Sequence, residues 1–254
     1  MKNIYCLLIV SFLCIFSLLP AGAQTLSEKD FQVLNMNDGL SDNDIHSVAK
    51  DTEGFMWFGT GSGLNRYDGR TFKVFRMPGI SYRRIDRVVS LDMDYLLLRS
   101  EQNLFLFDKK YERFLPVCDS VSKQPVMFAD FVADSDGSCW GVSSGELSEV
   151  NFPSSFVQDT AFVSVRHVVN NSQSDPFVVL CMGEDGKMLY CASRNGTVYR
   201  FTPGQRQLKK VCDGQLSSGR WVSSLLNDDS FIWIPTVGDG LYGYDLTNGK
   251  LHHW

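Results

Sequence analysis

The stretch that decides the fold is residues 51–60, which read DTEGFMWFGT. It recurs in altered form as DSDGSCWGVS at residues 134–143 and as NDDSFIWIPT at residues 227–236. Two weaker copies lie between, in which Leu97 and Leu189 stand where the others have tryptophan. Successive copies of this position are 40, 43, 49 and 44 residues apart. Such a period suits four short strands with their turns.

A second element trails each copy. It is an apolar residue followed three positions later by another, usually aromatic. The five pairs are Leu64/Tyr67, Leu104/Phe107, Leu147/Val150, Val198/Phe201 and Leu241/Tyr244. Each unit therefore predicts an apolar first strand, a turn of the Asp-Gly type, a second strand with the tryptophan, an alternating third strand and a more polar outer strand.

One four-stranded sheet cannot bury both of its faces, and stacking such sheets around an axis solves this. The sequence predicts an all-β protein, a β-propeller of four-stranded antiparallel blades with about five blades present. The expected blades span about 38–78, 79–118, 124–170, 174–213 and 216–254. A β-sandwich does not need a tryptophan repeated at this period, and the coils of a solenoid are shorter.

The closure of the ring is a separate question. Phe31 to Leu34 resembles an outer strand donated to the last blade, but Lys250 to Trp254 predicts that the last blade has an outer strand of its own. Both cannot occupy one place, so we expect an incomplete ring. Such an arc leaves apolar faces and strand edges bare.

The first 23 residues predict a secretory signal peptide. Lys2 precedes an apolar run from Ile4 to Leu19, and Ala21-Gly22-Ala23 forms a small-x-small cleavage site. The run is shorter than the ~20 residues of a membrane span. We therefore expect a periplasmic chain of residues 24–254 with no membrane span after cleavage.

Charge and cysteines exclude several classes of function. The formal charge of −5 becomes −6 when Lys2 is removed, and there is no basic block, so nucleic-acid binding is disfavoured. Five cysteines remain after cleavage, an odd number without a C-x-x-C pair, which argues against zinc. Cys181 and Cys191 on neighbouring strands could form a disulfide or remain buried free thiols, and we favour the thiols.

No catalytic constellation stands out. Asp51 and Trp57 differ in spacing from the Asp-box of sialidases, which favours turn chemistry. His252 and His253 are adjacent on a strand and point to opposite faces, so they would not chelate together. Asp42-Asn43-Asp44 lacks the spacing of a calcium loop and predicts a polar turn. We expect no metal, no cofactor and no catalytic residue.

Propeller geometry predicts where a ligand would bind. The loops between blades share one end of the sheets with the loops between second and third strands. Candidate ligand-binding residues there are Asn43, Arg83, Arg84, Arg194, Asn195, Arg220 and Trp221, with Asp42, Asp44 and Asp239 in the same loops. Arginine and tryptophan would suit a sugar, through hydrogen bonds and stacking, or an acidic glycan, through ion pairing.

Residues 38–75 resemble a known family. DGLS at 38–41, the D-x-x-G-x-x-W-x-G-T pattern at 51–60 and GLNRY at 63–67 match the two-component regulator propeller repeat almost completely. The resemblance implies the periplasmic sensor of a hybrid two-component system of the Bacteroidetes type, which commonly responds to glycan fragments. In full receptors of this kind, further repeats, a transmembrane helix and a histidine kinase follow.

Three functions are compatible with these residues. The first is a non-catalytic, ligand-sensing propeller, as a fragment of a two-component receptor, whose partners would be an oligosaccharide and further propeller blades or a kinase-bearing chain. The second is an exported scaffold for protein–protein contacts. The third is a propeller lyase or hydrolase, which would need an acidic or histidine catalytic residue that the sequence does not single out.

Overall fold

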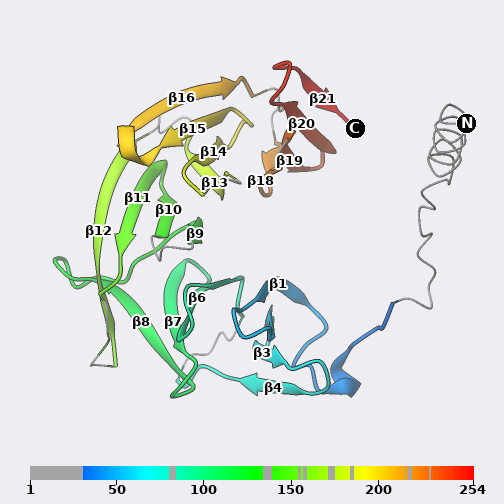
Figure 1. The fold of residues 1–254 in the computed structure, drawn as a ribbon, viewed down its shortest axis with the longest axis vertical. Helices are drawn as coiled ribbons and strands as arrows, with labels where there is room; N and C mark the ends of the chain where they lie inside the picture. Colours follow the sequence, from blue (N-terminus) through cyan, green and yellow to red (C-terminus); the bar gives the residue numbers. More distant parts are fainter. Residues whose placement is uncertain are drawn as a thin grey trace, which may run out of the picture. The chain divides into compact units, whose positions relative to one another are not determined.

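The computed structural model describes residues 31–79, 84–133, 139–153, 156, 159–170, 175–183, 186–214, 216, 219–228 and 230–254. The chain divides into two compact units, residues 1–34 and 35–254. The second unit is built almost entirely of antiparallel strands (Figure 1). The expected signal peptide lies outside the described residues. In the part of the chain that the structure describes, no helix is long and apolar enough to cross a membrane.

Five groups of strands follow one another along the second unit, as predicted. The first sheet contains β1 (Ile45–Lys50), β2 (Met56–Thr60), β3 (Gly63–Tyr67) and β4 (Phe72–Phe75). The second contains β5 (Arg87–Ser90), β6 (Tyr95–Ser100), β7 (Asn103–Asp108) and β8 (Arg113–Asp119). The third contains β9 (Asp130–Ala133), β10 (Cys139–Ser143), β11 (Glu146–Asn151) and β12 (Ala161–Asn170).

The remaining strands form two more sheets. The fourth sheet contains β13 (Phe177–Met182), β14 (Leu189–Ser193), β15 (Val198–Thr202) and β16 (Gln207–Cys212). The fifth contains β17 (Trp221–Val222), β18 (Leu226–Asn227), β19 (Phe231–Val237), β20 (Leu241–Asp245) and β21 (Leu251–His253). Each of the five apolar pairs in the sequence lies on a third strand, namely β3, β7, β11, β15 or β20.

One connection between sheets was not expected. The long outer strand β12 pairs antiparallel with β11, but its first residues, Ala161 to Val163, pair parallel with Val117 to Asp119 of β8. The second and third sheets therefore share a continuous ladder of eight strands. The other sheets form separate ladders, although the Ile85 N–H just before β5 donates to the Thr60 carbonyl of β2 at 2.9 Å.

The core consists of four apolar clusters, each between two successive sheets. The second strand of each sheet presents one large side chain to the next sheet, and we call this the marker position. Trp57 and Trp140 occupy it in the first and third sheets, where they are 1% and 5% exposed. Trp57 contacts Phe107 at a ring distance of 5.6 Å, and Trp140 contacts Phe201 at 5.5 Å. The tryptophan thus packs between sheets.

The structure corrects the alignment of the fourth unit by one residue. Trp57 pairs across the ladder with Arg66, and in the fourth sheet the residue that pairs with the corresponding Arg200 is Tyr190, not Leu189. A slip of one residue along a strand moves a side chain to the other face. Leu189 accordingly packs toward the third sheet, while Tyr190 packs toward the fifth and occupies the marker position.

The aspartate that recurs at the start of the repeat has a direct structural role. The Asp51 carboxylate accepts hydrogen bonds from the backbone N–H groups of Glu53 and Phe55, both at 3.0 Å, and from the Trp57 indole N–H at 2.8 Å. Asp228 holds the turn and Trp233 of the fifth sheet in the same way. The aspartate therefore closes the turn and orients the tryptophan, which confirms the interpretation as turn chemistry.

Of the remaining expectations, some are confirmed and some are corrected. Phe31 to Leu34 form no strand, whereas the last blade has its own outer strand, β21. Cys181 and Cys191 are free thiols, because they pack in different clusters on opposite faces of their sheet. Burial raises the pKa of the Cys181 thiol to about 12. The first strand of a sheet, which the sequence predicts to be apolar, is not always buried, since Val48 of β1 is 52% exposed.

The outer faces of the first and fifth sheets remain partly open. Ser47 of β1 faces the second sheet, where its hydroxyl accepts the Val88 N–H, so its neighbour Val48 points the other way. On the fifth sheet the face away from the fourth carries Trp233 and Trp254, at a ring distance of 5.5 Å, and Trp254 is 61% exposed. Among the described residues, no buried cluster joins the fifth sheet to the first.

Candidate ligand-binding face

The topology places two sets of loops at one end of the sheets. Because neighbouring strands run antiparallel, the turn between the second and third strands lies at the same end as the segment that leads into the first strand. We call this end the loop face. It carries six of the seven predicted ligand-binding residues, and Arg83 lies outside the described residues.

In the first sheet, the predicted residues make structural hydrogen bonds. Asn43 accepts the backbone N–H of Met36 at 2.9 Å through its side chain. The Asp42 carboxylate accepts the Asp44 N–H and the Ser62 hydroxyl, and these bonds lower the pKa of Asp42. This segment is the polar turn that the sequence predicted.

In the second sheet, Arg84 forms an ion pair with Asp86 at 2.5 Å. The backbone carbonyl of Arg84 also accepts the Ser100 hydroxyl at 2.7 Å, which ties the loop to the end of β6. The guanidinium is thus held at the loop face by a neighbouring carboxylate.

The fourth and fifth sheets carry the remaining candidates. The Asn195 side chain accepts the N–H and the hydroxyl of Thr197, at 2.9 and 2.8 Å, so it closes its own turn. Arg194 is exposed on the same turn. Arg220 lies against Gly238, and Trp221 is 46% exposed at the start of β17. Of these four residues, Arg194 and Trp221 are the ones free to reach outward.

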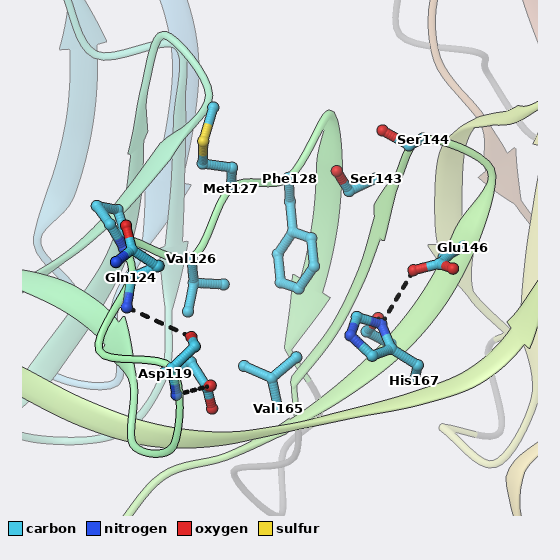
Figure 2. A pocket seen from close by; sticks show the side chains of 13 residues that line it. Asp119, Gln124, Val126, Met127, Phe128, Ser143, Ser144, Glu146, Val165 and His167 are labelled. Carbon is cyan, nitrogen blue, oxygen red and sulfur yellow. Dashed lines mark hydrogen bonds and ion pairs between the residues drawn. The ribbon is translucent and has the colours of Figure 1, made fainter.

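The loop face also contains a pocket that the sequence did not reveal. It lies where the second and third sheets meet and has a volume of about 310 Å³. Figure 2 shows the Phe128 ring between Val126 and Val165, with polar side chains around them. The polar lining residues are Asp119, Ser122, Gln124, Ser143, Ser144, Glu146, Ser148 and His167.

The connection between the second and third sheets forms one wall of this pocket. Phe128 donates its N–H to Gln102, and the Val126 carbonyl accepts the Leu104 N–H, so the connection is held on the second sheet. Gly141 of β10 leaves room for the Phe128 ring, because a Cβ at this position would lie 2.2 Å from the ring. The apolar floor is therefore fixed by both sheets.

The opposite wall carries the titratable groups. His167 Nδ1 lies 3.1 Å from a Glu146 carboxylate oxygen and 3.0 Å from the Ser148 hydroxyl. In a catalytic triad the carboxylate and the nucleophile contact different ring nitrogens. Here both contact Nδ1, and Ser148 is 2% exposed, so this arrangement does not activate a nucleophile. It suits hydrogen bonding to a ligand through Nε2 and the carboxylate.

A second charged group lies on the innermost strands. Asp130 of β9 contacts Arg87 of β5 at 3.7 Å and accepts the Leu180 N–H of β13 at 3.2 Å. Burial raises the pKa of Asp130, while the nearby arginines oppose that shift. This network joins three successive sheets, which makes its role structural. Among the described residues, no cluster of His, Cys, Asp and Glu has the geometry of a metal site.

Comparisons with known proteins identify the repeat. A family described as two component regulator propeller matches residues 39–62. Histidine kinase P4 of Formosa agariphila is 37% identical over 78 residues, which cover 30% of this chain and 5% of that protein. The chain therefore carries the predicted repeat and spans a small part of the curated relative that it matches.

Solved structures share the fold. The extracellular domain assigned to the hybrid two component system BT3049 of B. thetaiotaomicron has a TM-score of 0.63 at 18% identity, covering 87% of this chain and 31% of that one. The corresponding domain of BT4673 has a TM-score of 0.58 at 17% identity, covering 88% and 38%. Virginiamycin B lyase of Staphylococcus aureus has a TM-score of 0.58 at 12% identity, covering 88% and 73%.

Proposed function

We propose that this chain, built on the two component regulator propeller repeat, is the ligand-sensing part of an exported two-component receptor. Residues 24–254 would lie in the periplasm after removal of the signal peptide, and the chain would catalyse no reaction itself. Kinase activity would reside in a kinase-bearing part or partner. The names of the matched kinase and receptor domains support this assignment.

The observation that carries the proposal is the pocket between the second and third sheets. It combines an apolar floor that includes one aromatic ring with convergent polar side chains, the two kinds of group that bind and orient a small molecule. The apolar floor of Val126, Phe128 and Val165 can contact the apolar face of a sugar, and His167 and Glu146 can bond its hydroxyl groups. The ladder through β12 fixes both walls before binding, which reduces the ordering cost. The proposed ligand is therefore an oligosaccharide.

Binding should depend on the polar wall. Replacing Glu146 with glutamine or His167 with alanine is expected to weaken oligosaccharide binding by about tenfold or more, the loss for one hydrogen bond to a charged or strongly polar group. Titration calorimetry with a panel of oligosaccharides would measure this. Arg166→Gln is the matched control, because Arg166 is the neighbour of His167 on β12 and pairs with Glu149 instead.

Binding at the predicted loop residues would give a different set of mutational effects. If Arg194→Ala and Trp221→Ala abolish binding while Glu146→Gln does not, the ligand binds at the predicted loop residues and the pocket is not the site. If no oligosaccharide class binds to the wild-type protein, glycan sensing is contradicted.

The open face of the fifth sheet supports a further part of the proposal, that additional propeller blades cover it. Every marker residue in the first four sheets packs against the next sheet. Trp233 occupies the same position in the fifth sheet and is held by Asp228, but the aromatic rings that contact it, those of Phe231 and Trp254, belong to its own sheet. The side chain is thus oriented for a sixth blade with a large apolar residue on its third strand.

The open face of the fifth sheet should promote self-association. We expect the purified chain to self-associate as its concentration rises, because large aromatic side chains are exposed together. Trp254→Ser should weaken this association severalfold in sedimentation velocity experiments. Tyr111→Ser serves as the control, since Tyr111 is 65% exposed on the second sheet. A monodisperse monomer that melts in one cooperative step would count against an incomplete ring.

A further inference from the structure

A second cavity opens between the fourth and fifth sheets, away from the loop face. It has a volume of about 270 Å³ and is lined by Tyr190, Arg200, Lys209, Lys210, Val211, Tyr244 and Leu246. The turns that connect third and fourth strands lie at this end of the sheets. The cavity is therefore distinct from the pocket proposed for the oligosaccharide.

The cavity concentrates positive charge in a chain whose formal charge is −5. Lys210 forms an ion pair with Asp213, which is exposed. No ion pair or hydrogen bond of the side chains of Arg200 and Lys209 is found among the described residues. Two cations therefore face this space without a carboxylate.

The arrangement of these two cations is unfavourable by itself. Arg200 of β15 pairs directly with Lys209 of β16 in the antiparallel ladder. Side chains at directly opposite positions lie close together, and like charges there destabilise a sheet. An anion between them removes that repulsion and gains two charge-assisted hydrogen bonds.

The other lining residues of the cavity indicate what kind of molecule could bear the anionic group. Tyr190 pairs with Arg200 on the inner side, Tyr244 comes from the fifth sheet, and Leu246 and Val211 add apolar surface. We propose that this cavity is an oxyanion-binding site, which takes a sulfate, phosphate or carboxylate group borne on a small ring or free in solution. The planar guanidinium of Arg200 suits the bidentate geometry of such groups.

An oxyanion bound in this cavity would also contact two sheets at once. The cations come from the fourth sheet and Tyr244 from the fifth, so a bound anion adds contacts across the junction that holds the fifth sheet. A ligand that binds only the folded state raises its stability according to its concentration relative to the Kd. The oxyanion should therefore stabilise this end of the unit.

The experiment uses the purified protein and inorganic sulfate, with chloride at equal ionic strength as reference. We expect sulfate to raise the melting temperature in a saturable manner, and Arg200→Gln or Lys209→Gln to weaken the apparent affinity at least tenfold. Arg70→Gln should leave the affinity unchanged, because Arg70 is an exposed cation on the first sheet. Glucose 6-sulfate and glucose form a second pair of probes.

The relative affinities of these probes distinguish a sulfated sugar from a free anion as the ligand. Tighter binding of glucose 6-sulfate than of sulfate assigns the site to a sulfated sugar, and equal binding assigns it to the free anion. Without sulfate, at low salt, Arg200→Gln and Lys209→Gln should melt no lower than the wild type, because they relieve repulsion. Equal stabilisation of wild type and both variants by sulfate overturns the proposal. Binding at the loop-face pocket is untouched by these variants, so failure of one site does not imply failure of the other.

Discussion

Replacing Asp51 with alanine should lower the free energy of unfolding by about 3–5 kcal/mol, the loss typical of breaking a buried ion pair from one side. The Asp51 side chain is fully buried and bonds the Trp57 indole and two backbone N–H groups. Its carboxylate also lies 3.6 Å from the ammonium of Lys109, which belongs to the second sheet and is 7% exposed. Alanine would leave the Trp57 indole and the two turn N–H groups without this acceptor, and it would remove one of the two carboxylates beside Lys109, the other being that of Glu53.

The same motif in the fifth sheet provides the comparison. Asp228 makes the same bonds to its turn and to Trp233, and those bonds lower its pKa, but Asp228 is only half-buried. Asp228→Ala should therefore cost clearly less than Asp51→Ala, because water replaces the lost acceptor. Urea denaturation followed by circular dichroism would measure both. Equal losses for the two variants would contradict the role given to burial and to Lys109.

The second large effect concerns Gly141. A Cβ at this position would lie 2.2, 2.3 and 2.5 Å from three atoms of the Phe128 ring. Phe128 is 3% exposed and packs in the cluster between the second and third sheets, so the ring cannot simply swing into solvent. Gly141→Ala should cost about 1–3 kcal/mol, as overpacked cores do. It should also abolish oligosaccharide binding, since the displaced ring forms the pocket floor.

Gly204→Ala is the matched control. Gly204 has no atom near the position of a Cβ, and its backbone is not in the left-handed region. This variant should keep both stability and binding. If Gly141→Ala melts like Gly204→Ala and binds the same ligands, the Phe128 ring is not fixed by Gly141 and the pocket floor is adaptable.

Much of the fold follows from short-range chemistry that is visible in the sequence. The turn that Asp51 closes and the Trp57 that it orients are local, so their spacing identifies each unit wherever the residues are kept. In the fourth unit a tyrosine replaces the tryptophan, and an apolar Leu189 precedes it. Hydrophobicity alone cannot distinguish two adjacent apolar residues, and only the cross-strand pairing of Tyr190 with Arg200 identifies which of them faces the fifth sheet.

The pocket and the join between sheets depend on long-range contacts. Gln124 to Phe128 lie between two repeat motifs, and nothing local indicates that they fold back on the second sheet. His167 and Glu146 come together only because β11 and β12 are adjacent. The predicted loop residues did fall at one end of the sheets, since that placement follows from strand order. However, Asn43 and Asn195 hold their own turns, which a residue type cannot reveal.

The strand β12 gives the unit an uneven stiffness. No ladder of strands crosses the other junctions between the described sheets, but bending between the second and third sheets must stretch main-chain hydrogen bonds from Ala161 to Val163. These two sheets therefore act as one rigid block, and any change of curvature is concentrated at the softer junctions on either side.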